Sequence, residues 1–408
     1  MTAHLRKKYC SSKAKGQELA PSIRYYRNIR NVPADWDKVV PEEKVLMRIP
    51  YLKALESAPP TGMQFAYILY YLGKEAIGVS YCQIQHFSAE KSIRYDEGEK
   101  APSFFVSLGR YIRGFVASRF EFNTLVCGNL LFTGEHGFYF KPDKIDRAQM
   151  ILLVDQSLQK LQKQLQGKSL PISVVLYKEF YADNLRSSSQ LKDNSYNEFT
   201  IQPNMILDIP AHWQEFDHYL ADLSSKYRVR TRRARKKLKD IQCRELQLEE
   251  VEKLLPRMYD LYTAVAGHSG FNVVNLNKNY LYALKKELPE LFKIYGYFQD
   301  EKLIAFYTTL MTGNELEAHF LGFERSFNRS HQIYLNILYD LVQAGIDRNA
   351  DRVIFARTAL EIKSSVGAVA HEMHCYLRHR NSFSNRFLQP LLDYLRPDTD
   401  WQPRHPFK

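Results

Sequence analysis

Residues 294–323, IYGYFQDEKLIAFYTTLMTGNELEAHFLGF, carry the pattern that decides the fold. Two runs rich in aromatic and β-branched residues, Ile294–Phe298 and Leu303–Met311, flank a polar turn at Gln299–Lys302. A third such run, Glu315–Phe323, follows directly. Aromatic and β-branched residues favour strands, and a short polar turn between two such runs is typical of a hairpin. The sequence therefore predicts an antiparallel hairpin that continues into a third strand.

A second copy of this hairpin lies 227 residues earlier in the chain. Phe65–Leu72 and Ala76–Gln85 are strand-like runs on either side of a short turn. When the two hairpins are overlaid at that shift, residues of similar size coincide, among them Tyr70 with Tyr297 and Gly78 with Ala305. A repeat of this kind indicates two copies of one structural unit.

The elements after each hairpin follow the same order. In the first half we expect strands at 104–108 and 122–125, a long amphipathic helix at 144–166 and a strand at 172–177. In the second half the strand at 315–323 leads to a helix at 328–348 and a strand at 352–355. The predicted fold is α+β, with two tandem units that each contain a mixed, largely antiparallel sheet flanked by helices.

This pattern divides the 408 residues into four parts. Residues 1–60 form a polar lead with short helices, because prolines interrupt every longer element there. The first unit spans 61–204 and includes a polar surface loop at 183–197, and the second unit spans 205–390 and contains the presumed active cleft. Residues 391–408 form a C-terminal tail.

The positive charge of the chain is concentrated in Lys226–Lys239, which carries nine basic residues and no acidic one. The formal net charge is +12, so the rest of the chain contributes only about +3. Tyr227, Thr231, Ala234 and Leu238 recur at helical spacing and predict a helix that packs along one narrow stripe. Such a helix favours an anionic partner, and we name Arg228, Arg232 and Arg235 as candidate contacts; the alternative is a solvated charged face.

Composition excludes several classes of protein. Five cysteines without a Cys-x-x-Cys pair argue against a disulfide framework and a zinc finger, and favour a reducing compartment. No apolar run approaches the roughly 20 residues of a membrane helix, so we expect a cytoplasmic protein that could rest on the inner face of the membrane. We expect no metal, because His371, Cys375 and His379 are spaced by four residues along a predicted strand, and His374 lies between them.

The connection at 324–330, between a predicted strand and a predicted helix, is a candidate anion site. A helix N-terminus presents unpaired backbone N–H groups, which suit a pyrophosphate or a carboxylate. Arg325 and Arg329 would add charge, and Asn328 or Ser330 could cap the helix. The connection lacks a glycine-rich loop, so an ordinary strand-to-helix connection is the competing interpretation.

Three segments give the chain a resemblance to a known family: SSKYRVRTRRARKK at 224–237, EAHFLGF at 317–323 and RTALEIKSSVGA at 357–368. Together with the order of elements, they resemble the FemAB-like branch of the GNAT acyltransferase superfamily, in which two GNAT folds are fused. The resemblance implies transfer of an acyl or aminoacyl group from a thioester or an aminoacyl-tRNA to an amine, and a place in cell envelope biogenesis. It also implies that Lys363 lies at the reacting centre. Two features depart from the family: the glycine-rich pyrophosphate loop of simple GNAT enzymes and the long coiled-coil insertion of some tRNA-dependent relatives are both missing.

The chemistry of acyl transfer supplies further candidates. The amine must lose a proton, and negative charge on the carbonyl oxygen must be stabilised. Strand alternation predicts Leu316, Ala318 and Phe320 on one face, with Glu317 and His319 on the other face, towards a cleft. We expect His319 to be the base, with a structural histidine as the alternative, and Lys363 to stabilise the oxyanion between Arg357 and Glu361. His136, in the loop at 133–137, could approach a ligand in the first unit.

Three hypotheses of function follow. The first is an N-acyltransferase that uses acyl-CoA and an amine acceptor. The second keeps the reaction but acylates a long-chain base or another lipid amine from an acyl carrier protein, with the basic helix on an anionic surface. The third is a non-catalytic relative that binds RNA or the cell envelope through 226–239.

Overall fold

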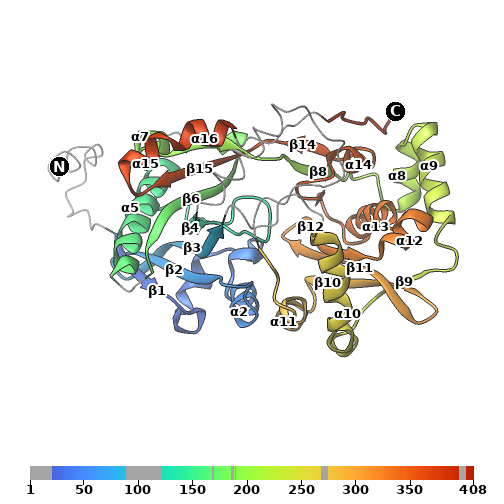
Figure 1. The fold of residues 1–408 in the computed structure, drawn as a ribbon, viewed down its shortest axis with the longest axis horizontal. Coiled ribbons are helices and arrows are strands. Elements are labelled where there is room, and N and C mark those ends of the chain that lie inside the picture. Colours follow the sequence, from blue (N-terminus) through green and yellow to red (C-terminus); the bar gives the residue numbers. More distant parts are fainter. Residues whose placement is uncertain are drawn as a thin grey trace, which may run out of the picture.

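The structure is a computed structural model that describes residues 21–88, 121–167, 170–184, 188, 190–267, 274–394 and 401–408. Two sheets lie side by side along the long axis of the molecule (Figure 1). Each sheet is largely antiparallel with one parallel strand pair, and helices flank both. The predicted fold class is therefore confirmed.

The first sheet has the order β1-β2-β3-β4-β6-β15-β7, and β5 pairs with β3. Its strands are β1 (Ser22–Tyr26), β2 (Gln64–Leu72), β3 (Glu75–Ser88), β4 (Glu121–Cys127), β5 (Phe138–Phe140), β6 (Ile172–Tyr181), β15 (Met373–His379) and β7 (Asn197–Thr200).

The second sheet has the order β14-β8-β13-β12-β11-β10-β9. Its strands are β14 (Val369–His371), β8 (Asn204–Asp208), β13 (Arg352–Ile354), β12 (Glu315–Phe323), β11 (Lys302–Thr312), β10 (Phe292–Gln299) and β9 (Gln242–Glu245).

The two hairpins share an irregularity that supports the repeat. In the first hairpin Tyr70 pairs with Gly78, and the register shifts between Tyr70 and the next residue. In the second, Tyr297 pairs with Ala305, and the register shifts between Tyr297 and its successor. Bulges sit at specific positions of a sheet, so a bulge in the same place confirms the overlay at 227 residues.

One strand of the predicted second unit, 205–390, adds to the sheet of the first unit, whereas the crossing before residue 205 lies where the two units were divided. β15 lies in the first sheet, between β6 and β7, although it follows β14 of the second sheet. β8 takes the equivalent place in the second sheet, directly after β7 of the first. The chain thus crosses between the sheets at 200–204 and again at 371–373. The sequence pattern reveals a strand but not the sheet to which it adds. The strand β1 likewise extends the first sheet into the segment expected to be a helical lead.

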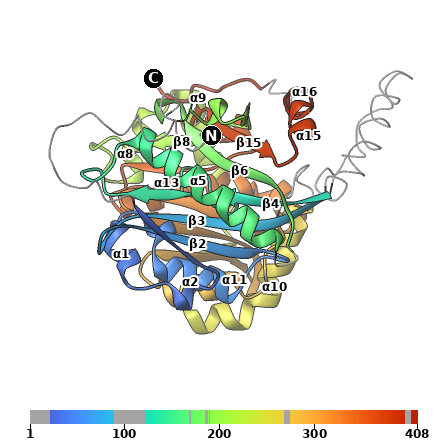
Figure 2. The same cartoon turned by 90° about the vertical axis from the view of Figure 1, so that its left-hand side faces the viewer.

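One apolar core joins the units. Helix α2 (Ile49–Ser57) of the first unit contacts α11 (Tyr280–Glu287) of the second, and α11 contacts α10 (Leu248–Ala266). Helix α1 (Asp35–Val39) lies on the same lower side of the molecule in Figure 2. Their shared cluster contains large buried side chains from both halves: Trp36, Tyr51, Tyr67, Phe132, Tyr280, Phe292, Phe306 and Leu310. Each unit also has a core of its own, beneath α5 (Arg147–Gln166) in the first and α13 (Ile333–Asp347) in the second.

Two predicted elements need correction and one cannot be compared. The helix expected at 328–348 is two helices, α12 (Arg325–His331) and α13, because Gln332 between them has a left-handed φ of 52°. The loop expected at 183–197 contains the short helix α7 (Gln190–Asp193). The strand expected at 104–108 lies outside the described residues.

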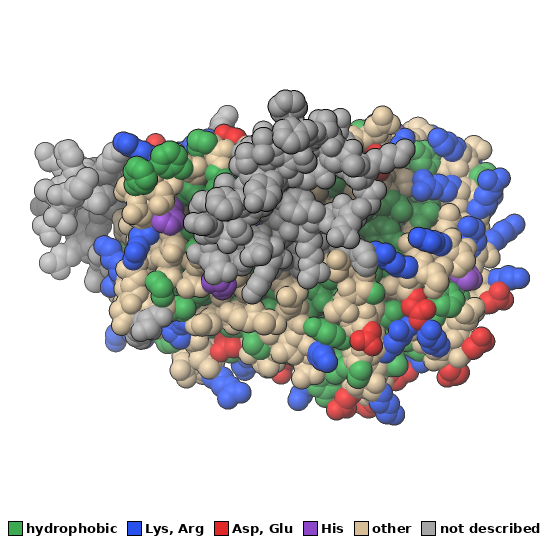
Figure 3. All heavy atoms as spheres, in the orientation of Figure 1, with side chains coloured by type: hydrophobic (Ala, Val, Ile, Leu, Met, Phe, Trp, Pro, Cys, Tyr) green, Lys and Arg blue, Asp and Glu red, His purple; other side chains and the backbone are tan. Residues whose placement is uncertain are grey.

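The basic segment forms α9 (Ser225–Lys236), with Ser224 at its N-cap and with Thr231 and Ala234 buried. It follows the short helix α8 (Phe216–Asp222). On the face drawn in Figure 3, Lys and Arg side chains gather at the upper right, over the region of α9 and α12. Among the described residues, no helix is both long and apolar enough to cross a membrane.

Candidate active site

The parallel strands β12 and β13 separate after only three residue pairs. Glu315 pairs with Arg352, and the last pair is Glu317 with Ile354. Beyond it β13 stays with β8, since the N–H of Phe355 donates to the carbonyl of Met205 at 2.8 Å. Within the described residues, β12 therefore has no ladder partner on this side from Ala318 to Phe323. We call the place where β12 and β13 separate the second fork, because it lies in the sheet of the second unit. The backbone N–H and C=O groups of β12 that are unpaired there can hydrogen-bond an extended ligand.

A bulge follows on β12 at the second fork. Its register against β11 shifts between Tyr307 and Thr309, and Thr308 Oγ1 bonds both the N–H and the carbonyl of Phe320 at 2.9 Å. The extra residue corrects one expectation: Phe320 does not share the face of Leu316 and Ala318 but packs on the core that joins the units. The bulge re-aims side chains at this point, as bulges near functional sites often do.

Glu317 projects from β12 towards the first unit. Its side chain is 2% exposed, and its carboxyl has no hydrogen bond or ion pair among the described residues. Burial, with smaller contributions from Glu315 and Glu179, raises the pKa of Glu317 well above its usual value, and Lys178 partly opposes this shift. A buried carboxyl with a raised pKa is a suitable proton acceptor near neutral pH.

His319 lies on the same side of β12 but is held by aromatic rings. Its ring stacks on Phe132 of the first unit at 3.9 Å between centroids, and its Nε2 is 3.0 Å from the hydroxyl of Tyr280. Burial lowers the pKa of His319 well below its usual value, so the ring is neutral at physiological pH. Glu317 and His319 thus lie on the same side of β12, as expected, but His319 packs against aromatic rings of both units and not along a cleft.

Lys363 lies on α14 (Leu360–Ser364) and is 5% exposed. Its Nζ donates to the backbone carbonyls of Ala356 at 3.2 Å and Arg357 at 2.5 Å, directly after β13. Burial, assisted by the charge of Arg357, lowers the pKa of Lys363 to about 7. Two of the three N–H donors of the ammonium group are therefore engaged, which leaves one for a reacting group.

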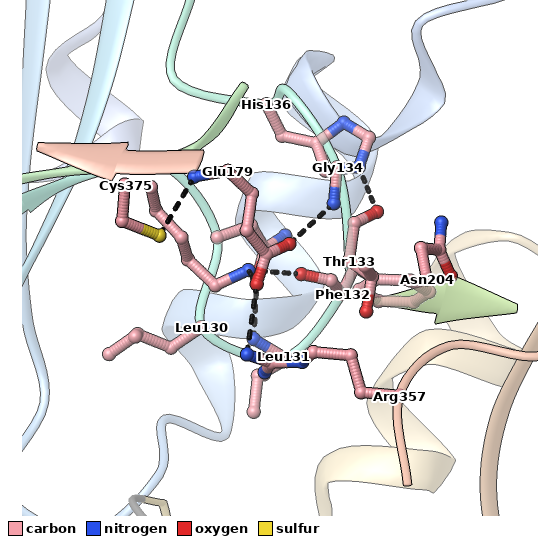
Figure 4. A network of polar contacts seen from close by, with 12 residues as sticks. Leu130, Leu131, Phe132, Thr133, Gly134, His136, Glu179, Asn204, Arg357 and Cys375 are labelled. Carbon is pink, nitrogen blue, oxygen red and sulfur yellow. Dashed lines mark hydrogen bonds and ion pairs between the residues drawn. The ribbon is translucent and has the colours of Figure 1, made fainter. Parts of the chain in front are cut away.

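A buried ion cluster connects these groups across the units (Figure 4). The carboxylate of Glu179 on β6 contacts Lys178 at 2.5 Å and Arg357 at 3.1 Å, and it accepts the N–H of Gly134 at 2.6 Å. Lys178 also donates to the carbonyl of Phe132 at 2.9 Å. Although burial alone would raise the pKa of Glu179, the two cations hold it below its usual value. The cluster thus holds Phe132, whose ring stacks on His319, and Arg357, whose backbone carbonyl binds Lys363.

Glu179, Lys178, Tyr280 and Phe132 were not predicted from the sequence. A signal was present for the first two, because ISVVLYKEFY places an adjacent Lys–Glu pair inside an otherwise apolar strand. Glu179 also has a left-handed φ of 60°, a conformation that is unfavourable for glutamate and often marks a functional site. No local pattern indicates that β6 meets the end of β13, since they lie in different sheets.

The residues expected to bind the donor lie on α12, not on a turn. Arg325 and Arg329 are exposed there. Asn328 Oδ1 accepts the N–H of Tyr334 at 2.9 Å and so satisfies the first turn of α13, while Ser330 Oγ bonds carbonyls of its own helix. Only the two arginines remain available to an anion in the arrangement that the structure describes.

Other predicted residues lie apart from the fork. Arg235 is occupied by an ion pair with Asp340 and stacks on aromatic rings, so its expected role as an anion contact is corrected to a structural one. Arg232 is exposed on α9, and Arg228 is half-buried. Glu361 pairs with Arg404 of the tail at 3.1 Å and does not face Lys363. His136 bonds the carbonyl of Thr133, and burial lowers its pKa to about 4.

No group of three or more His, Cys, Asp or Glu side chains suited to a metal ion occurs within the described residues. The histidines of β14 and β15 have separate environments. His374 Nδ1 lies 2.7 Å from Glu198, and His379 lies near Asn381. Cys375 accepts the N–H of Glu179 at 3.4 Å.

Residues 225–364 match the family described as an acetyltransferase (GNAT) domain. The matched segment lies in the second unit. It covers the second fork, its bulge and Lys363, and it supports an N-acyltransferase. The GNAT fold typically binds an acyl-CoA, although the glycine-rich loop that usually holds the pyrophosphate is missing from the matched segment.

Among solved structures, the chain is similar to FemX, with 12% identity and a TM-score of 0.47 over 84% of this chain and 96% of that one. It is also similar to a tandem GNAT protein from the clavulanic acid biosynthesis pathway, with 10% identity and a TM-score of 0.47 over 88% and 99% of the two chains. A third is L-PGS from Bacillus licheniformis, with 11% identity and a TM-score of 0.43 over 87% and 97%. No curated protein sequence matches the chain.

Proposed function

We propose that this protein transfers an acyl group from a thioester, with acyl-CoA as the donor, to an amine that enters between the two units. The observation that carries the proposal is the second fork. There an unpaired strand edge adjoins a bulge, and the buried carboxyl of Glu317 faces the other unit at the same place. Free N–H and C=O groups on β12 suit the amide-containing arm of an acyl-CoA, and the bulge brings backbone N–H groups near a carbonyl placed at the fork.

In the reaction the amine nitrogen attacks the thioester carbonyl, a C–N bond forms and the C–S bond breaks. The proton lost by the amine goes to a base, and the sulfur leaves as a thiolate that takes up a proton. We assign the base to Glu317 in preference to His319. Burial makes Glu317 a stronger proton acceptor than usual and His319 a weaker one. His319 then orients the acceptor as a neutral ring held by Tyr280.

Lys363 supplies positive charge near the developing oxyanion. Its cationic form is required for this, and with a pKa of about 7 that form is lost as the pH rises through neutrality. Arg357 shares this role through its contact with Glu179 and its proximity to Lys363. Arg325 and Arg329 are the candidate contacts for the phosphates of the donor, because they are exposed on α12.

The test is an assay of thiol release from acetyl-, octanoyl- and palmitoyl-CoA with a panel of amines. We expect transfer in the native protein and a large loss in Glu317→Gln and Lys363→Met. Full activity of both variants would refute the assignment of residues. No transfer and no CoA binding would refute acyl-CoA as the donor and direct attention to aminoacyl-tRNA or an acyl carrier protein.

A lipid amine is the second candidate acceptor, with an acyl carrier protein as donor. The observation in its favour is α9, whose exposed cations suit an acidic carrier protein or anionic headgroups. A product formed only from a long-chain base, and only with a carrier-bound donor, would distinguish this candidate from the first.

A further inference from the structure

Most of the large exposed hydrophobic side chains that the structure describes lie on one side. Of the five such residues in the described part of the chain, four lie on α9, on β14, or on and just after α15 (Ser382–Arg386). These elements occupy the upper side of the molecule in Figure 1, and Figure 2 shows α9 and α15 on that side as well. The four residues and their exposed fractions are Val229 42%, Val369 63%, Phe383 71% and Phe387 59%. The fifth, Leu72, lies at the β2–β3 hairpin and is 36% exposed.

The two phenylalanines form a fixed projection and not a frayed end. Asn381 caps α15, since its Oδ1 accepts the N–H groups of Phe383 at 2.8 Å and Ser384 at 3.3 Å. The rings of Phe383 and Phe387 contact each other edge to face, with centroids 5.2 Å apart. Arg380 precedes the pair, Arg386 lies between the two phenylalanines in the sequence, and both arginines are exposed. A paired aromatic projection with arginines close to it in the sequence matches the chemistry of the boundary between lipid headgroups and acyl chains.

The cations of α9 form the second part of the same side. Apart from Arg235, which pairs with Asp340, no side chain of this helix has an ion pair among the described residues. The free ones include Arg230, Arg232 and Arg233, all exposed. The rest of the chain has little net charge, so the unpaired positive charge of α9 favours binding to a dense array of anions.

We propose that this side of the protein docks on an anionic lipid bilayer, with α9 on the headgroups and the Phe383–Phe387 projection inserted at their base. Either feature alone fits several partners. Their combination on one side favours a bilayer. Surfaces that bind single-stranded nucleic acid combine cations with aromatic rings on which the bases stack. Here α15, which carries the aromatic pair, lies at the opposite end of this side from α9. The docking surface is separate from Glu317 and Lys363, so the inference does not depend on acyl transfer.

The experiment measures co-sedimentation of the full chain with phosphatidylcholine vesicles, with and without phosphatidylglycerol. Each cation close to an anionic membrane strengthens binding to it. The loss of three cations in Arg230→Ala/Arg232→Ala/Arg233→Ala should therefore weaken vesicle binding roughly 100-fold. Phe383→Ser/Phe387→Ser should weaken it roughly 10-fold, and this loss should persist at high salt, where the contribution of the cations is screened.

Two matched controls keep the proposal testable. Lys53→Ala/Lys74→Ala/Lys253→Ala removes the same charge from exposed positions on α2, the β2–β3 turn and α10, and Leu72→Ser removes an exposed apolar side chain elsewhere. Both should bind as the native protein does. Equal losses in the control and test variants, or no binding to anionic vesicles, would overturn the proposal. So would a Phe383→Ser/Phe387→Ser variant that binds normally. Duplex RNA serves as a competitor. If it abolished vesicle binding of the native chain, and Phe383→Ser/Phe387→Ser did not change that binding, the surface would be a nucleic-acid site instead.

Discussion

The two units differ most where their parallel strands separate. In the first unit β4 and β6 pair from Asn123 to Cys127, and the loop 128–137 then folds back against the end of β6. Lys178 and Glu179 bind that loop through the carbonyl of Phe132 and the N–H of Gly134, and a cavity of ≈ 200 Å³ lies beside Lys178. In the second unit no such loop occupies the fork among the described residues. Within that part of the chain, the first fork is filled by the loop of its own unit, and we call it the closed fork. The second fork is not filled in this way, and we call it the open fork.

This difference suggests a division of labour. The ion cluster that closes the first fork also binds Arg357, which directly follows the open fork. We therefore propose that the first unit supports the site and that the second unit provides the strand edge on which a donor binds. Duplicated units can retain one site and convert the other into its support, because the fold survives the loss of function.

The largest effect should come from Glu179. Glu179→Ala would leave Lys178 buried without its partner and release the first-unit loop, so we expect the free energy of unfolding to fall by about 3–5 kcal/mol. Urea denaturation measures this change. The matched control, Glu249→Ala at an exposed position on α10, should stay within about 0.5 kcal/mol of the native protein. An equally small effect at Glu179 would show that the cluster does not hold the units together.

Lys363 should affect catalysis more than folding. If it stabilises the oxyanion, Lys363→Met should lower kcat about 100- to 1,000-fold. The native rate should fall as the pH rises through about 7, where Lys363 loses its proton, whereas Lys363→Arg should retain some activity without this decrease. A native pH profile that rises through neutrality and is unchanged in Lys363→Arg would contradict this role.

The pH dependence of stability gives a second view of Lys363. Its pKa is about 7 in the folded protein and 10.5 for an ordinary lysine. Between these values the unfolded state binds one more proton than the folded state, so this group makes the protein more stable as the pH rises. The slope of unfolding free energy against pH between 7 and 10 should therefore be smaller in Lys363→Met. An unchanged slope would show that Lys363 keeps its proton.

The overlay of the hairpins predicts an asymmetric response at one pair of positions. A Cβ on Gly78 would lie 2.0 Å from the ring of Phe140, so Gly78→Ala should cost about 1–3 kcal/mol. The equivalent Ala305 already carries that atom, and Ala305→Gly should cost only about 1 kcal/mol. Thermal unfolding measures both changes, and Gly78→Ala/Phe140→Leu should recover part of the first loss. Equal losses at the two positions would indicate that Phe140 adapts freely.

The smallest effect concerns Tyr280. Tyr280→Phe removes the hydroxyl that bonds His319, which should cost about 0.5–1.5 kcal/mol of stability. If this contact orients His319 for the acceptor, the variant should also raise KM for the amine while KM for the donor stays constant. A change in stability with both KM values unchanged would make the contact structural only.

The sequence indicated the fold well where the information is local. Alternation and turn residues predicted both hairpins, and the shift of 227 residues located the same bulge in each. The addition of β15 to the first sheet was missed because the face pattern of a strand does not identify its neighbours. The site shows the same contrast. Strand alternation predicted that Glu317 and His319 share a face, and the family resemblance pointed to Lys363, whereas the contact of Glu179 with Arg357 depends on β6 and the end of β13 meeting in space.

The most direct test of the account is equilibrium binding of palmitoyl-CoA to two double variants with the same loss of charge. Arg325→Ala/Arg329→Ala alters the segment before α13 at the open fork, and Lys141→Ala/Lys144→Ala alters the corresponding segment before α5 at the closed fork. We predict that the first weakens binding about 10-fold or more, as expected for the loss of two charge-assisted contacts, and that the second leaves it unchanged. Equal effects of the two variants, or a larger effect at the first unit, would contradict the claim that the second fork is the donor site.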